Sequence, residues 1–502
     1  MKTGLFATST LVAAIATLPA SAGITVTDLN ATADVDDAVI ADGGTTIDVA
    51  AGVTVRDITG DTEDILQLIS GGYTVTNNGI IDGGPEDGIV GSVGPHTIVN
   101  NGTIQAVRRV IDLDSTDFSL TNGSTGVVLG SREALRIDLT GSFSLDNDGL
   151  IRSTGDEAVL VRPDGATPLV TIDNAATGQI IASGSGKAIE IRESLVGSFL
   201  NNAGVISSDR DTIEVNSGEF TINNFAGASI SAGTGNAIKN DAGATLTIIT
   251  AGDITTDAEV AINFGEGNSE LTISGGTISG DITSSVAFGG TNSVEVKFEN
   301  AAEFVFDDDM DGVTSLSKAG QGNTVLNGNA SVGNATVTDG RLSVNGTLTV
   351  DVSVESGELG GDGTIDGNVS LLGQLGPGNS AGSLAILGDL DLGDGSNIVW
   401  DLGDASDELT VDGIASANGM WTLELVSDGA PTLLEYEVLA GLNADASFFS
   451  NLDQVILPDD WNASVTVGPD SVRVVVPEPT SLGILAVGSL LIARRRRHRL
   501  PL

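Results

Sequence analysis

A short pattern that recurs at nearly regular intervals constrains the fold of this chain more than any other feature. In most copies an apolar residue is followed two positions later by Asn, and a glycine comes a few positions further on. The spacing between consecutive copies is that of one coil of a stacked repeat. The leading apolar positions are Val75, Ile98, Leu120, Leu145, Ile172, Phe199, Ile222, Ile248 and Ile273.

Each repeat contains three short runs in which apolar and polar residues alternate. One repeat, for example, contains residues 171–174, 179–181 and 188–191, with Gly178 where the chain must turn. Strands this short cannot cover their own apolar faces, but coils stacked at about 4.8 Å cover one another. The sequence therefore predicts an all-β parallel β-helix, a solenoid of about 22–27 residues and three short strands per coil.

The recurring asparagines define a column in this predicted fold. If the coils stack in register, the side-chain amides lie at one corner, where each amide donates to the next one and accepts from the one before. Ligand contacts are the alternative role for these residues. The predicted ladder consists of Asn77, Asn100, Asn122, Asn147, Asn174, Asn201 and Asn224.

Composition excludes several classes of function. The net charge is −47, and Lys2 with five arginines near the C-terminus accounts for six of the 21 basic residues, so the body is more acidic still. Such a surface repels nucleic acids and anionic lipids. There is no cysteine, which excludes disulfides, thiol catalysis and thiolate metal sites.

The N-terminus has the features of a secretory signal. Lys2 is followed by a largely apolar run from Leu5 to Leu18 and by small residues at Ala20 and Ala22. We expect a signal helix over residues 1–22, removed by signal peptidase before Gly23. A buried N-terminal helix is the alternative.

The C-terminus combines three elements: the triplet Pro477, Glu478 and Pro479, an apolar run over 482–493, and a basic cluster. The run is short of the roughly 17–25 residues that usually span a bilayer, although the flanking arginines can extend it by snorkelling. A simple tail anchor is the alternative. The arginines of the cluster, expected to stay cytoplasmic, are Arg494, Arg495, Arg496, Arg497 and Arg499.

This tail resembles the PEP-CTERM protein-sorting domain of Gram-negative bacteria. The resemblance implies a short transmembrane helix that anchors the chain transiently in the inner membrane. It also implies cleavage near the triplet by exosortase, a membrane-embedded cysteine protease. Such proteins tend to accompany exopolysaccharide and biofilm systems.

A second resemblance concerns the later part of the body. Residues 316–328 roughly match the pattern Leu-x-Lys-x-Gly-x-Gly-x-apolar-x-Leu-x-Gly, and residues 360–367 and 375–384 are similarly rich in glycine. These stretches are similar to the β-strand repeats of autotransporter passengers, which implies a right-handed helix. Autotransporters end in a large β-barrel translocator, whereas only the short tail follows Val475 here, so we expect export by other machinery.

We therefore expect five segments. The region 420–475 gathers Trp421, Tyr436, Phe448, Phe449 and Trp461, and we interpret it as a cap on the solenoid, with a carbohydrate-stacking patch as the alternative. The segments are the signal peptide 1–22, a β-helix with the Asn ladder 23–285, its autotransporter-like continuation 286–419, the cap 420–475 and the sorting tail 476–502.

Candidate chemistry is sparse. Asp307, Asp309 and Asp311 match the first half of a calcium loop, but position 12 is Lys318 in place of the bidentate Glu, so we expect a solvated turn. His96 is the one histidine outside the tail and carries no catalytic arrangement. Two mixed clusters are either parts of a lyase or glycosidase site or solvated coil faces: Arg108, Arg109, Asp112 and Asp114, and Asp209, Arg210 and Asp211.

We assign no catalytic residues, no resident metal and no cofactor from the sequence. The expected protein is a structural or adhesive β-helix, exported to the outer surface or extracellular matrix and associated with exopolysaccharide or biofilm. The expected partners are signal peptidase, exosortase and a matrix polymer, and no nucleic acid. A polysaccharide-active β-helix enzyme is the alternative.

Overall fold

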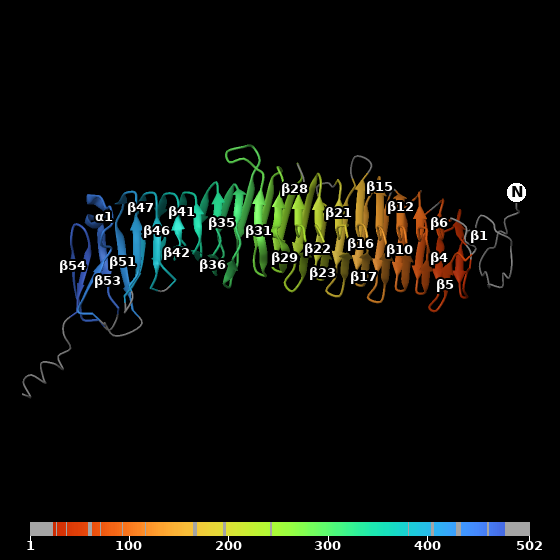
Figure 1. Cartoon of the computed structure of the whole chain (residues 1–502), viewed down its shortest axis with the longest axis horizontal. Helices are drawn as coiled ribbons and strands as arrows, with labels where there is room; N and C mark the ends of the chain where they lie inside the picture. The colour runs from red at the N-terminus through yellow and green to blue at the C-terminus, as the bar shows by residue number, and fades with distance from the viewer. Residues whose placement is uncertain are drawn as a thin grey trace, which may run out of the picture. The chain divides into compact units, whose positions relative to one another are not determined.

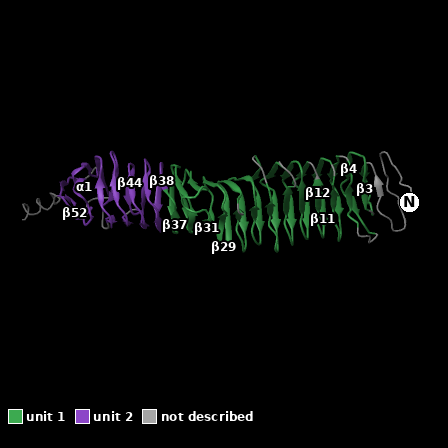
Figure 2. Cartoon of the chain, turned by 90° about the horizontal axis from the view of Figure 1, so that it is seen from above, with its two compact units in different colours: residues 1–334 green, residues 335–502 purple. Residues whose placement is uncertain are grey.

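The computed structural model divides into two compact units, residues 1–334 and 335–502, which are distinguished by colour in Figure 2. Both units are built from parallel β coils, and the described part of the chain contains almost no helix (Figure 1). The chain is a parallel β-solenoid, as predicted. The structure describes residues 24–26, 28–36, 38–58, 63–70, 72–92, 94–115, 117–163, 168–193, 197–240, 243–379, 381–402, 406–427, 433–458 and 461–476.

Unit 1 has three stacks of strands, and most of its coils contribute one strand to each stack. The first stack contains β2 (Leu29–Ala31), β4 (Thr46–Val49), β7 (Thr74–Asn77), β10 (His96–Asn100), β13 (Phe118–Asn122), β16 (Phe143–Asn147), β19 (Val170–Asn174), β22 (Phe199–Asn202), β25 (Glu219–Asn224), β28 (Thr245–Thr250), β30 (Ser269–Ile273), β32 (Val294–Phe298) and β35 (Ser315–Lys318). The second stack contains β5 (Thr54–Arg56), β8 (Ile80–Asp82), β11 (Thr103–Ala106), β14 (Val127–Gly130), β17 (Leu150–Ser153), β20 (Gln179–Ala182), β23 (Val205–Ser208) and β26 (Ser229–Ala232).

The third stack contains β1 (Ile24–Val26), β3 (Val39–Ala41), β6 (Leu66–Leu68), β9 (Ile89–Gly91), β12 (Ile111–Ser115), β15 (Leu135–Leu139), β18 (Val159–Pro163), β21 (Ile189–Ile191), β24 (Ile213–Val215) and β27 (Ile238–Asn240). The long strand β29 (Asp253–Phe264) pairs with both β26 and β27. The later strands are β31 (Ile278–Ser284), β33 (Phe304–Phe306), β34 (Met310–Val313), β36 (Asn323–Leu326) and β37 (Ala330–Val332).

Unit 2 repeats the three-strand coil with shorter connections. Its first stack contains β38 (Ala335–Val337), β41 (Val352–Val354), β44 (Val369–Leu371), β47 (Leu390–Leu392) and β50 (Ala415–Ala417). A second contains β39 (Arg341–Val344), β42 (Glu358–Gly361), β45 (Gln374–Pro377), β48 (Asn397–Asp401), β51 (Trp421–Val426) and β53 (Leu452–Ile456). A third contains β40 (Thr347–Thr349), β43 (Thr364–Ile365), β46 (Ser383–Ile386) and β49 (Glu408–Val411).

The core is a set of aliphatic columns inside the coils. Ile98, Leu120 and Leu145 pair on successive strands, and all three are fully buried. Their neighbours along each strand face outward, because side chains of a strand alternate between its two faces. The chain can therefore bury its apolar residues with few aromatic rings.

An unbroken chain of side-chain amides runs through unit 1. Asn77 Nδ2 donates to Asn100 Oδ1 at 2.8 Å, and Asn100 Nδ2 donates to Asn122 Oδ1 at the same distance. The chain continues through Asn147, Asn174, Asn202 and Asn224 and ends on the hydroxyl of Thr250. All of these side chains are buried, and the Asn amides also donate to backbone carbonyls. The ladder thus gives hydrogen-bond partners to buried amide groups, which would lower the stability of the fold if they were left unpaired.

One predicted member of the ladder is wrong by one residue. Asn202, and not Asn201, pairs with Asn174, because this coil is longer than the sequence pattern suggests and aligns Leu200, in place of Phe199, with Ile172. Asn201 faces outward, where it donates to Asp173 at 2.7 Å and accepts from Asn223 at 2.8 Å. Similarly, Leu271 and not Ile273 aligns with Ile248.

Coil length also varies more than predicted. In unit 2, Ala335 pairs with Val352 and Val352 with Val369, so these coils are much shorter than the predicted repeat. The strands keep their pairing while the turns between them shorten, because only the strands have to match their neighbours.

The lysine of the autotransporter-like motif is part of the core. Lys318 is fully buried, and its ammonium group donates to the carbonyl of Gly320. Gly320 and Gly322 lie directly against the backbone of the coil before, at Asn300 and Ala302, where a Cβ atom has no room. The motif residues therefore act in coil packing.

Most of residues 433–476 leave the coil pattern, although β53 continues the second stack of unit 2. Strands β52 (Glu435–Val438), β54 (Ser464–Val467) and β55 (Val472–Val475) form an antiparallel sheet, and α1 (Ala446–Ser450) contacts β50. The five aromatics of the predicted cap, residues 420–475, are all buried, and the rings of Trp421 on β51 and Phe448 on α1 lie 5.0 Å apart. Burial leaves no exposed ring face for a sugar, so the carbohydrate-stacking alternative is wrong.

The predicted signal helix and transmembrane helix lie outside the described residues. Within the part that is described, no helix has both the length and the apolar character needed to cross a bilayer.

Removing one rung should test the ladder. Asn122→Ala leaves the amide of Asn100 and the carbonyl oxygen of Asn147 without their partner in a buried place, so we expect a loss of about 2 kcal/mol or more in unfolding free energy. Urea unfolding measures this loss. The matched control is Asn201→Ala. Because this amide faces outward, its removal should lower the unfolding free energy by less than about 1 kcal/mol. Equal losses would contradict the assigned register.

Candidate functional site

One group of charged residues of unit 1 lies on the outward side of the third stack. In β12 the core residues Ile111 and Leu113 point inward, so Asp112 and Asp114 point outward, and the next strands place Arg136, Asp138 and Arg162 beside them. We call this surface, with the flanking residues Asp64, Asp87 and Arg109, the ionic face.

The ionic face is a continuous network of ion pairs. Arg109 Nη1 lies 2.6 Å from an Asp112 oxygen and 3.8 Å from Asp87. Arg136 lies 3.1 Å from Asp138, which also pairs with Arg162 at 2.8 Å. Of the predicted cluster Arg108, Arg109, Asp112 and Asp114, Arg109 pairs with Asp112, whereas Arg108 pairs with Glu86 at 2.8 Å. Asp114 lies exposed on β12.

A shallow cleft of about 320 Å³ lies on this face, lined in part by Asp64, Asp112, Asp114 and Arg136. Burial raises the pKa of Asp64, and the nearby carboxylate of Asp87 adds to the increase. Burial also raises the pKa of Asp112 and outweighs the opposing charges of Arg109 and Arg136. A carboxyl group with a raised pKa is suited to proton transfer near neutral pH. The arginines, however, are already paired with carboxylates.

A second ionic cluster lies further along the same stack. Lys187 Nζ is 3.2 Å from Glu190 and 3.3 Å from Glu214, two nearly buried carboxylates on β21 and β24. Arg192 and Lys239 complete the pairing at 3.0 and 3.5 Å. Burial opposes ionisation of Glu190, but Lys187 and Arg192 outweigh it and lower its pKa. We did not select this cluster from the sequence, although the two glutamates occupy the same place in successive repeats.

The other predicted clusters serve turns. Asp209 accepts the Gly184 N–H at 2.8 Å, Asp211 accepts the Asn236 N–H at 2.7 Å, and Arg210 lies between them on the turn after β23. Asp307 accepts from Asn327 and Asp309 from Asn329, each from the following coil. Asp307 and Asp309 therefore help to hold one coil to the next. Among the described residues, no three carboxylates or histidines lie close enough together to hold a metal ion. This holds also for Asp311, the third residue of the predicted calcium loop.

Two predicted sets lie outside the described residues. They are the signal-cleavage residues Ala20 and Ala22, and the tail with Pro477, Glu478, Pro479, Arg494, Arg495, Arg496, Arg497 and Arg499. For the tail, comparison with family models gives a match over residues 475–497 to the PEP-CTERM protein-sorting motif. The chain carries a PEP-CTERM sorting motif. The motif indicates a protein that is exported, sorted at the membrane and processed by exosortase.

The PEP-CTERM match covers the tail alone, so it says how the chain is sorted and not what the solenoid binds. A search of the curated proteins found no match to the chain.

The Lys187 cluster gives a pH-dependent prediction. Lys187→Met leaves Glu190 and Glu214 with less compensation, so we expect a loss of about 3 kcal/mol in unfolding free energy at pH 7. The lowered pKa of Glu190 means that its contribution is present at neutral pH and lost as pH falls through the folded-state pKa. The difference from wild type should therefore shrink toward pH 4, as measured by thermal unfolding at several pH values.

The control for this change is Lys297→Met. Lys297 also lies between two glutamates, at 3.0 and 3.3 Å, but these are more exposed, so its loss should stay below about 1 kcal/mol. A Lys187→Met deficit that is independent of pH would contradict the assigned ion pairs.

Proposed function

We propose that this protein is a non-enzymatic structural or adhesive element of an exopolysaccharide or biofilm matrix. The observation that carries the proposal is a sorting motif at residues 475–497 in a chain whose body is a parallel β-solenoid. We expect signal peptidase to cut after Ala22, the tail to hold the chain transiently in the inner membrane, and exosortase to cut near Pro477–Pro479. The body then reaches the outer surface or the matrix.

The outward side of the first stack supports a role in binding polymers. Paired positions on five consecutive strands, β7 to β19, carry a hydroxyl group, and the strands repeat at about 4.8 Å. Hydroxyl groups both donate and accept, so such a row can bind sugar hydroxyls along an extended chain. We call it the hydroxyl row; its members are Thr74, Thr97, Ser119, Ser144 and Thr171.

Binding to the producer's exopolysaccharide tests the proposal. Retention of the purified protein on immobilised polysaccharide should be saturable. The triple variant Thr97→Ala, Ser119→Ala, Ser144→Ala should weaken retention about tenfold, a loss of about 1.4 kcal/mol. The matched control replaces three hydroxyls in paired positions of the second stack and β29: Ser207→Ala, Ser231→Ala, Thr255→Ala. Absence of binding, together with unchanged biofilm after deletion of the gene, would refute the matrix role.

The ionic face supports a second candidate function, cleavage of a polysaccharide. Its cleft combines Asp64 and Asp112, whose pKa values are raised, with Arg136. A glycosidase needs two carboxyl groups, and a lyase needs a base near a cation. Turnover of acidic polysaccharides that is abolished by Asp112→Asn would favour this candidate over the matrix role.

Sorting has its own test. Replacing Pro477, Glu478 and Pro479 by alanine should leave unprocessed protein in the inner membrane, detected by fractionation and immunoblotting. The control, Pro469→Ala with Asp470→Ala, changes neighbouring residues before the motif and should be processed normally. Normal release of the triplet variant would refute exosortase processing at this site.

A further inference from the structure

The last strands of the unit 2 solenoid are covered unequally. The outer edge of β50 forms hydrogen bonds with the chain segment that follows it. Ala415 N–H donates to Asn443 O at 3.0 Å, and Asp445 N–H donates to Ala415 O at 2.9 Å. The last coil strand of the second stack, β51, pairs with β53. The third, β49, pairs with β46, and no other described strand of unit 2 pairs with it.

The free edge of β49 presents backbone groups. Asp412 N–H donates to Ile386 O of β46, and Glu408 N–H donates to the carbonyl of Gly382, the residue just before β46. In a parallel ladder, alternate residues of a strand bond to opposite neighbours. The N–H and C=O groups of Leu409 and Val411 therefore point away from β46, toward the place where a further strand would lie.

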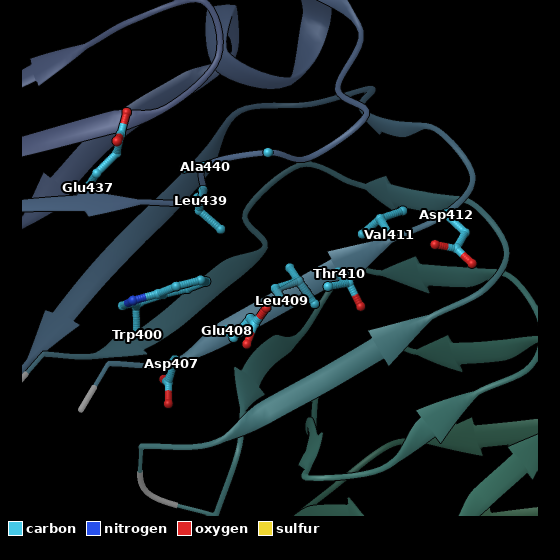
Figure 3. A pocket seen from close by; sticks show the side chains of 11 residues that line it. Trp400, Asp407, Glu408, Leu409, Thr410, Val411, Asp412, Glu437, Leu439 and Ala440 are labelled. Carbon is cyan, nitrogen blue, oxygen red and sulfur yellow. The ribbon is translucent and has the colours of Figure 1, made fainter.

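That place is a cleft of about 430 Å³, within the range of ligand pockets. β49 forms one wall, and Glu437, Leu439 and Ala440 come from the segment across it (Figure 3). Leu439 has φ 57°, the one left-handed non-glycine backbone among the described residues. Such a conformation costs free energy and persists where the surroundings impose it, so this wall is held in place.

The lining combines an apolar floor with an acidic rim. Leu409, Val411 and Trp400 are buried on the inward side, and Glu408, Asp412 and Glu437 are exposed. Asp407 adds a fourth carboxyl group; burial raises its pKa to about 7, although it accepts the N–H of Asp401 at 2.7 Å. The residues that line the cleft include no lysine or arginine.

We propose that this cleft binds an extended segment of another polypeptide, which pairs with β49 as an added strand. Such a strand continues the alternation of β49, so one set of its side chains lies over the apolar floor and the other lies beside Glu408 and Asp412. The ligand that fits is therefore a short extended segment in which apolar and basic residues alternate. Main-chain hydrogen bonds supply affinity, and the acidic rim selects the basic side chains.

The test uses the full chain and a fluorescein-labelled Val-Lys-Val-Lys-Val-Lys peptide, with binding followed by fluorescence anisotropy. We expect saturable binding. The same peptide with N-methylated amides, which cannot pair with a strand edge, should not bind, and a Val-Glu peptide should not bind either. The rim variant Glu408→Gln, Asp412→Asn, Glu437→Gln should weaken binding about tenfold or more.

The matched control removes three exposed carboxylates elsewhere in unit 2: Glu355→Gln, Asp366→Asn, Asp453→Asn. It should bind as the wild type does. Equal binding of the N-methylated peptide, or an equal loss in the control variant, would mean attraction to the acidic surface in general and would overturn the proposal. So would the absence of saturable binding. Dimers that form without peptide and disappear in the rim variant would show that a second copy of this chain occupies the cleft. That result would also overturn the proposal.

Discussion

The structure depends on the register between successive coils. Each strand pairs with the corresponding strand of the coils before and after it, and the pairing decides which side chains face inward. Because side chains alternate, a slip of one residue would move Leu120 to the surface and a polar neighbour into the core. The asparagine ladder resists such a slip, because each buried amide finds its donor and acceptor only when the corners align.

This constraint leaves the outward residues free to differ from one stack to the next. The first stack carries the hydroxyl row, while the third stack of the same unit carries the ionic face. Acidic residues outnumber basic residues 68 to 21 in the sequence. Along the third stack, nearly buried carboxylates such as Glu190 are nevertheless matched by cations from neighbouring positions. A solenoid can thus present several surfaces without changing its core, which is compatible with the matrix role that we propose.

Most of the fold could be predicted from the sequence, because apolar alternation and the Asn spacing report directly on strand pairing. The register failed at Asn201, where two adjacent asparagines give the pattern no means to choose, and the choice depends on the length of that coil. The short coils of unit 2 were missed because turns do not have to repeat. Arg109 and Asp112 are neighbours in sequence and were found, whereas Lys187 meets Glu214 across coils. The β49 cleft depends on where the segment of Leu439 lies, which no local pattern specifies.

The central claim, in-register stacking of the coils, can be measured by cross-linking, since the chain has no cysteine of its own. Thr97 and Ser119 are paired neighbours on the outward side of β10 and β13, within the separation of about 4.4–6.8 Å that a disulfide bridges. The account predicts that Thr97→Cys with Ser119→Cys oxidises to a disulfide rapidly, while Thr97→Cys with Thr121→Cys, two residues along the same face, does not. Equal or reversed rates for the two pairs would contradict the register.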